Sequence, residues 1–105
     1  MRRGEIWIAV MPLAIKTRPV LILSRDSMPA ARPEITVAYL TSKARNPLIE
    51  VALTAREDGV ASDCVVNLDS INTILKNRLI RRRCKLSAAR MLEVADALRA
   101  ALDLP

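Results

Sequence analysis

The chain has 105 residues, of which 17 are Lys or Arg and 11 are Asp or Glu, giving a net charge of +6. Its apolar content of 51% excludes intrinsic disorder, and the length predicts one domain, residues 1–105, with a modest core. No apolar run is long enough to span a membrane, and no signal-peptide core follows the first residues, so we expect a cytoplasmic protein.

Short apolar runs separated by turn-forming residues predict a series of strands. They are expected at residues 2–11, 20–24, 34–41, 48–54, 64–68 and 78–86. Loops are expected at residues 13–17, 25–33, 42–47 and 55–63, and residues 69–77 are expected to be irregular. In the third strand, Ile35, Val37 and Tyr39 are expected to share one face.

The run Val20-Leu21-Ile22-Leu23 is typical of a strand buried on both faces. Pro19 cannot donate a hydrogen bond to a neighbouring strand, so we expect it at the first position of this strand. Pro19 also favours an extended backbone at Arg18, which is therefore expected at the mouth of the strand. Such a position suits a catalytic or phosphate-binding Arg, although position alone favours a solvated charge.

The end of the chain predicts a helix. Ser87 offers an N-cap hydroxyl, and Met91, Val94, Leu98 and Leu102 follow at helical spacing. Several short strands followed by one helix predict a mainly β fold with a C-terminal α-helix, in which a small, strongly curved barrel carries the helix.

The residue types restrict the chemistry. The two cysteines, Cys64 and Cys84, are far apart in the sequence and the chain has no His, so we expect reduced structural thiols, no metal site and no cofactor. The positive charge favours an acidic partner, namely nucleic acid, an acidic protein segment or a membrane surface. Trp7 and Tyr39 are the only aromatic residues, so phosphate contacts and hydrogen bonds would dominate any recognition of nucleic acid.

Several segments, taken in order, carry a resemblance to a known family. They are Arg3-Gly4-Glu5-Ile6-Trp7, Arg18-Pro19-Val20-Leu21-Ile22-Leu23-Ser24, Tyr39-Leu40-Thr41-Ser42, Val65-Val66-Asn67-Leu68-Asp69-Ser70-Ile71-Asn72-Thr73, Arg78-Leu79-Ile80 and Leu86-Ser87. Together with the final helix they make the chain resemble the MazF/PemK (Kid) family of toxin endoribonucleases from type II toxin–antitoxin systems. The resemblance covers nearly the whole chain and implies an SH3-like β-barrel of the CcdB/PemK type.

The resemblance also implies an activity and partners. Members cleave single-stranded RNA at short sequences without a metal, act as homodimers, and are silenced by a partly disordered, acidic, MazE-like antitoxin; no membrane partner is expected. It implies catalytic roles for Arg18 and Thr41. The RNA-binding positions that we expect are Ser42, Lys43, Arg45, Asn67, Asp69 and Asn72, with Lys43 and Arg45 included because they lie in the turn directly after Thr41.

Two departures from the family pattern leave the general base open. Some members carry an acidic residue in the first loop, whereas residues 13–17 contain no carboxylate. PemK-type members place an Arg where this chain has Asn67. Attack by the RNA's own 2′-hydroxyl needs charge neutralisation, which Arg18 could supply, and a hydroxyl donor such as Thr41 or Ser42. Proton transfer would fall to Asp69, to water or to Arg18, and the products would carry 2′,3′-cyclic phosphate and 5′-hydroxyl ends.

Structural interpretations stand beside these roles. Thr41 could be an ordinary β-branched strand residue, and Asp69 could accept the hydrogen bond of an Asx turn. Alternation places Arg81, Arg83 and Lys85 on one face of the last strand, which fits an RNA track and a solvated outer face about equally.

Two other functions are compatible with the same fold. A gyrase-poisoning toxin of the CcdB type relies on a C-terminal Trp-Gly-Ile, whereas this chain ends in Asp103-Leu104-Pro105 and has its only Trp at position 7. A non-catalytic SH3-like module that binds RNA or an acidic peptide is the remaining alternative, and composition does not exclude it.

Overall fold

The computed structural model describes residues 1–12 and 16–105. Its strands, in chain order, are β1 (Glu5–Met11), β2 (Lys16–Ile22), β3 (Glu34–Thr41), β4 (Glu50–Leu53), β5 (Cys64–Leu75) and β6 (Leu79–Lys85). The helices are α1 (Ala55–Asp58), a short 3₁₀ turn η1 (Lys76–Arg78) and α2 (Ala88–Leu102). Among the described residues, no helix is long and apolar enough to cross a membrane.

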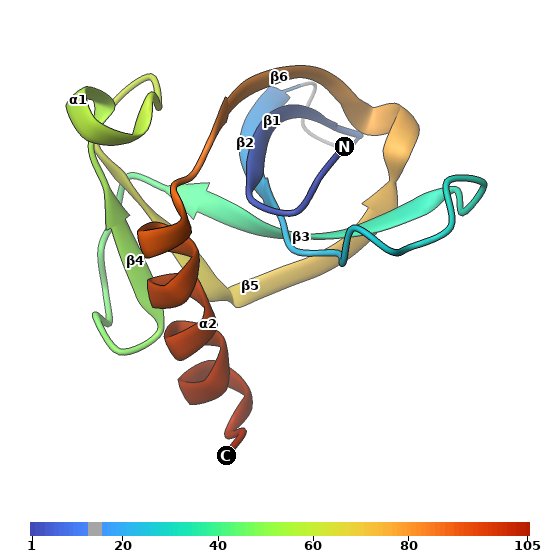
Figure 1. The fold of residues 1–105 in the computed structure, drawn as a ribbon. Helices are drawn as coiled ribbons and strands as arrows, with labels where there is room; N and C mark the ends of the chain where they lie inside the picture. Colours follow the sequence, from blue (N-terminus) through green and yellow to red (C-terminus); the bar gives the residue numbers. More distant parts are fainter. Residues whose placement is uncertain (13–15) are drawn as a thin grey trace.

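The strands form one antiparallel sheet in the order β4-β5-β3-β2-β1-β6. The sheet curls so strongly that β6 arcs over β1 and β2, while α2 packs against β4 and β5 (Figure 1). The predicted mainly β fold with a C-terminal helix is therefore confirmed. The curled sheet has two apolar faces. Residues of β4 contribute to the cluster on one face, and Leu79 of β6 contributes to the cluster on the other.

The middle of the sheet is buried on both faces, as the run from Val20 to Leu23 predicts. Val20 and Ile22 belong to an apolar cluster inside the curl of β1, β2 and β3, and Leu21 and Leu23 belong to a second cluster under α2. Their exposed fractions are at most 8%. Each such side chain contributes about 1.5–3 kcal/mol when it is fully buried.

The strand β5 is much longer than the sequence predicts. It continues through residues 69–75, which the polar composition had indicated as irregular. Pairing with β3 overrides that local preference, with Ala38 opposite Ile71 and Tyr39 opposite Asn67. The jump in register forms a bulge, so residues 68–70 have no partner on β3.

Two bounds differ from prediction at the start of the chain. The first strand begins at Glu5, because Gly4 makes a turn with φ of +92°. Of the expected loop 13–17, Lys16 and Thr17 already pair with Met11 and Val10, and residues 13–15 lie outside the described residues.

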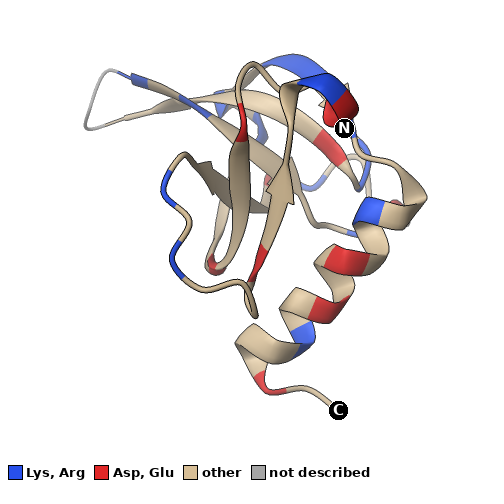
Figure 2. Ribbon diagram, turned by 90° about the vertical axis from the view of Figure 1, so that its left-hand side faces the viewer, with Lys and Arg blue, Asp and Glu red and all other residues tan. Residues whose placement is uncertain are grey.

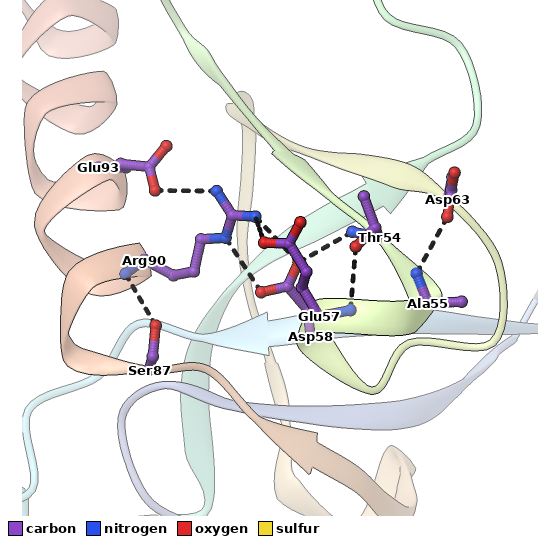
Figure 3. Close-up of polar contacts among 8 residues, drawn as sticks. All are labelled: Thr54, Ala55, Glu57, Asp58, Asp63, Ser87, Arg90 and Glu93. Carbon is purple, nitrogen blue, oxygen red and sulfur yellow. Dashed lines mark hydrogen bonds and ion pairs between the residues drawn. The ribbon is translucent and has the colours of Figure 1, made fainter.

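The predicted loop 55–63 contains a short helix that is tied to α2 (Figure 3). Thr54 is the N-cap of α1, and its hydroxyl accepts a hydrogen bond from the Glu57 amide at 3.0 Å. Ser87 is the N-cap of α2, as predicted, and its hydroxyl accepts from the Arg90 amide at 3.1 Å.

Arg90 joins the two helices through an ion pair. Its Nε lies 3.0 Å from Oδ1 of Asp58, whose side chain is only 5% exposed, and further nitrogens contact Glu57 and Glu93. Burial raises the pKa of the Asp58 carboxyl, but hydrogen bonds from Arg90 and from the Thr54 amide outweigh it, so the pKa lies below its ordinary value of 3.8.

We predict that Asp58→Asn destabilises the fold by about 1.5–3 kcal/mol near neutral pH, since it weakens hydrogen bonds to a charged acceptor. Because the folded-state pKa is lowered, the carboxylate's contribution is complete above its ordinary pKa and is lost as the pH falls through the lowered value. The free energies of unfolding of wild type and Asp58→Asn, measured with urea, should therefore differ at neutral pH and converge in acid.

The matched control is Asp96→Asn. Asp96 pairs with Arg99 at 3.0 Å on the same helix but is 81% exposed, so its loss should cost at most about 1 kcal/mol. Equal effects of the two substitutions would contradict the assignment of the Asp58 pair as a structural link.

Candidate functional site

Arg18 is held in place by a consequence of Pro19. In the register of β2 and β3, Val20 lies opposite Tyr39, and extending this register places Pro19 opposite Leu40. The Leu23 amide donates to the Thr36 carbonyl, so alternate carbonyls of β3, including that of Leu40, point toward β2. Pro19 has no N–H for the Leu40 carbonyl, and Nη2 of Arg18 donates to it instead, at 3.1 Å.

Pro19 is therefore not the first residue of its strand, as the sequence had predicted, but its fourth. Pro19 is tolerated there because the pairing of β2 with β3 begins only at Val20, so the N–H that Pro19 lacks would face β3 just beyond the paired residues. On its other side, Pro19 lies opposite Ile8 of β1.

Arg18 lines a small pocket of about 200 Å³ at the end of β3. The pocket contains three cationic side chains together with hydroxyl and amide groups, and none of the described residues that line it is acidic. Its lining residues are Arg18, Tyr39, Thr41, Lys43, Arg45, Asn67 and Ser70. Such a set of donors fits an anion of the size of a phosphate group.

The pocket brings together most of the predicted site. Arg18, Thr41, Lys43, Arg45 and Asn67 all line it. Asn67 lies at the start of the β5 bulge, opposite Tyr39, and its Oδ1 accepts a hydrogen bond from the Asp69 amide at 2.9 Å. Asn67, rather than Asp69, is thus the acceptor of the Asx turn in this segment.

Three predicted residues are not part of the pocket. Ser42 is the first residue after β3 and lines a neighbouring cavity of about 330 Å³, which Thr41 also borders. Asp69 is exposed at the bulge. Asn72 is exposed, and its side-chain amide is bonded to other groups of the chain: its Nδ2 donates to the Tyr39 hydroxyl at 3.4 Å and its Oδ1 accepts from the Thr73 amide at 2.9 Å.

The neighbouring cavity also receives part of the basic strand β6. Arg81 and Arg83 line it together with Ser42, while Arg82 points elsewhere and pairs with Glu5 at 3.2 Å. The alternation predicted for Arg81 and Arg83 is therefore confirmed. Ile80 falls in a register shift of the β1–β6 pairing, between Leu79 and Arg81, and its side chain is exposed.

The basic residues of the site gather on one side of the molecule. Figure 2 shows Lys and Arg residues of β2 and of the turn after β3 on the side away from α2, which carries acidic residues of its own. A polyanion that approached this side would meet the pocket of Arg18 first.

Comparison with known proteins identifies this arrangement. The model of the PemK-like, MazF-like toxins of type II toxin–antitoxin systems matches residues 2–102. The chain belongs to this toxin family. Its relatives in Mycobacterium tuberculosis include "Probable endoribonuclease MazF2", 44% identical over 100 residues and covering 95% of this chain and 96% of that protein, and "Endoribonuclease MazF9", 35% identical and covering 99% and 98%.

Solved structures of MazF toxins share the fold. The Mycobacterium tuberculosis toxin MazF-mt6 superposes with a TM-score of 0.86 at 34% identity, covering 96% of this chain and 98% of that chain. A mycobacterial endoribonuclease in complex with its cognate antitoxin gives a TM-score of 0.85 at 27% identity, covering 100% and 97%. These matches confirm the expected CcdB/PemK-type fold.

The cysteines of this MazF-type toxin are free thiols. Burial raises the pKa of both the Cys64 and the Cys84 thiol, so neither is prepared for nucleophilic chemistry. In the part of the chain that the structure describes, no group of three or more Cys, Asp or Glu side chains is arranged to hold a metal ion.

Sequence reasoning missed three residues of the site. Tyr39 and Ser70 line the pocket, and Glu50 supports it from below. The Glu50 carboxylate is 8% exposed and accepts hydrogen bonds from the Arg45 amide at 3.0 Å and the Asn46 amide at 2.9 Å. The sequence signal for this supporting role of Glu50 was an acidic residue at the start of a strand, directly after a basic turn.

We predict that Glu50→Gln loosens the basic turn of residues 43–49. Loss of a charged acceptor should speed amide hydrogen exchange at Arg45 and Asn46 by about 10- to 100-fold, corresponding to about 1.5–3 kcal/mol of local stability. Exchange at Val66 in the sheet centre should change much less. The control Glu34→Gln, at an exposed strand start, should leave the turn amides unchanged; equal protection in both variants would contradict the role of Glu50.

Proposed function

We propose that this MazF-type toxin is an endoribonuclease that cleaves single-stranded RNA by attack of the RNA's own 2′-hydroxyl on the adjacent phosphorus. The observation that carries the proposal is the polar pocket, in which an anchored Arg18 faces Thr41 among further cationic groups. Relatives that match nearly the full chain are named endoribonucleases, which supports the same reaction class.

Arg18 is the group suited to the developing charge. Its planar guanidinium can contact two oxygens of the phosphorane at once, and only one of its nitrogens is used by the Leu40 carbonyl. A donor fixed before the reaction begins stabilises the transition state without reorganisation, which is often the largest single contribution to catalysis.

Thr41 is arranged as a hydroxyl donor. Its Oγ1 accepts a hydrogen bond from the Lys43 amide at 3.3 Å, so its own hydrogen remains available for a phosphate oxygen or for the 2′-oxygen. Lys43 and Arg45 are exposed at the rim, where they can hold neighbouring phosphates. Asn67 and Ser70 add hydrogen-bonding groups along the opposite wall.

The pocket offers no evident general base. The chain contains no His, and no acidic side chain is among the described residues that line the pocket. Proton transfer is therefore assigned to water or to the exposed Asp69 at the pocket's edge. We expect a slow enzyme, whose rate depends on alignment and charge neutralisation rather than on acid–base catalysis.

The partners follow from the same surface. We propose that the protein works in the cytoplasm as a homodimer, and that an acidic, disordered antitoxin segment covers the basic surface that binds RNA. A mycobacterial relative has been solved in complex with its cognate antitoxin. Light scattering that gave a monomer mass at micromolar concentration would contradict the dimer.

We predict that Arg18→Ala lowers the single-turnover cleavage rate by at least about 10²–10³-fold, and that Arg18→Lys restores little of it, because Lys lacks the planar fork. RNA affinity should fall far less, since Lys43 and Arg45 remain. The assay is cleavage of one end-labelled oligonucleotide, with end-group analysis of the products. Cleavage should persist in EDTA, because no step requires a metal.

The control for the loss of charge is Arg99→Ala on α2, which should cleave at the wild-type rate. A folded Arg18→Ala protein with near-wild-type activity would refute the role of Arg18. A 5′-phosphate product would refute attack by the 2′-hydroxyl, whatever the effect of Arg18.

We also predict that an acidic antitoxin segment and RNA compete. Addition of the cognate antitoxin should displace a fluorescent oligonucleotide from inactive Arg18→Ala toxin, because both ligands neutralise the same basic side chains. A ternary complex that contains toxin, RNA and antitoxin, with unchanged affinities, is the contradicting outcome. Competition should weaken with rising salt as surface charges become screened.

A further inference from the structure

The Arg18 guanidinium is restrained from two directions. Its Nη2 donates to the Leu40 carbonyl at 3.1 Å, and its central carbon lies 4.7 Å from the centroid of the Tyr39 ring. A guanidinium over an aromatic ring is attracted by the ring's electron density, and this attraction requires no hydrogen bond from its N–H groups. The edge that is not bonded to Leu40 therefore stays free for a ligand.

Tyr39 is itself held firmly. It pairs with Val20 on one side and with Asn67 on the other, and its ring packs against the apolar cluster inside the curl. Its hydroxyl accepts a hydrogen bond from Nδ2 of Asn72 at 3.4 Å, and Asn72 is fixed in turn by the Thr73 amide at 2.9 Å. The ring is thus a fixed platform, supported from the sheet.

We propose that Tyr39 is a positioning residue for Arg18. The ring fixes the plane of the guanidinium so that its free N–H groups face the pocket, and Asn72 holds the ring through the phenol oxygen. This inference rests on the proposed function, because it concerns the group that would contact the scissile phosphate. Tyr39 transfers no proton; its contribution passes entirely through Arg18.

Without the ring, Arg18 would keep only the hydrogen bond to Leu40. A single contact leaves a long side chain free to rotate about it, and ordering it again for each transition state costs entropy. The stack removes that cost before RNA binds. Arg18 is only half-buried, so water can reach its guanidinium, and water does not hold a side chain in one orientation.

The experiment compares Tyr39→Phe with Tyr39→Leu in single-turnover cleavage. Phe keeps the ring, so its rate should stay within about 3-fold of wild type. Leu removes the ring, and the rate should fall by about 3- to 30-fold, the range expected for a cation–π contact. In both variants RNA affinity should change by less than about 3-fold, because Lys43 and Arg45 remain, and the pH dependence of the rate should stay that of wild type. A Phe variant as slow as the Leu variant, or one with an altered pH profile, would overturn the proposal in favour of a role for the hydroxyl.

Two further measurements separate positioning from general destabilisation. Ile35→Val removes volume from the same apolar cluster away from Arg18, and it should lower thermal stability without changing the rate. In wild type, the side-chain Nε–H signal of Arg18 in NMR spectra should carry a ring-current shift that Tyr39→Leu abolishes and Tyr39→Phe retains. A rate loss in Ile35→Val equal to that in Tyr39→Leu, or an unshifted Arg18 signal in wild type, would overturn the proposal.

A double-substitution cycle distinguishes failure of this inference from failure of the proposed function. If Tyr39 acts through Arg18, Tyr39→Leu should slow wild type but should not slow Arg18→Ala further. Equal effects in both backgrounds would overturn the positioning role while leaving Arg18 essential. Full activity of Arg18→Ala would instead refute the proposed function itself.

Discussion

The site depends on one missing backbone donor. Pro19 interrupts the hydrogen bonding between β2 and β3, and the carbonyl of Leu40 that it leaves without a backbone partner is satisfied by Arg18. A buried carbonyl without a partner is unfavourable, so the same requirement that stabilises the strand end also fixes the guanidinium. The pairing of an Arg with a following Pro therefore has a structural reason that is independent of any catalytic role.

The curled sheet supports this arrangement from below. The second half of β2 is buried on both faces, through Val20, Leu21 and Ile22, and Arg18 lies just before this buried segment. Groups that must hold a reacting phosphate within a fraction of an ångström are best attached to such elements. In the proposed function, neighbouring nucleotides would be contacted by an exposed turn, which Glu50 ties to the sheet by accepting hydrogen bonds from two backbone amides.

Sequence reasoning was accurate where local patterns dominate. The apolar run after Pro19 indicated a doubly buried strand, and Ser87 with its helical spacing indicated α2. It failed where pairing between distant segments decides. Nothing local indicates that residues 69–75 extend β5, or that a bulge turns Asn67 and Ser70 into the pocket.

The site residues show the same division. Arg18 and Thr41 were predicted and lie in one pocket, because Thr41 ends β3 and Arg18 lies where the pairing of β2 with β3 has stopped. Ser42 was expected in the same pocket as Thr41, but it follows the end of β3 and lines only the neighbouring cavity, whereas Thr41 borders both. Tyr39 was predicted as a residue of the third strand but not as part of the site, since its contact with Arg18 depends on a register that the sequence does not display.

The bulge of β5 separates residues that pair with β3 from residues that do not. Asp69 and Ser70 face no partner on β3, so exchanging them breaks no pairing with that strand, whereas Val66 and Ile71 on either side keep the sheet aligned. The charge and shape of this part of the surface can therefore change while the pairing of β5 with β3 and the core beneath it stay as they are.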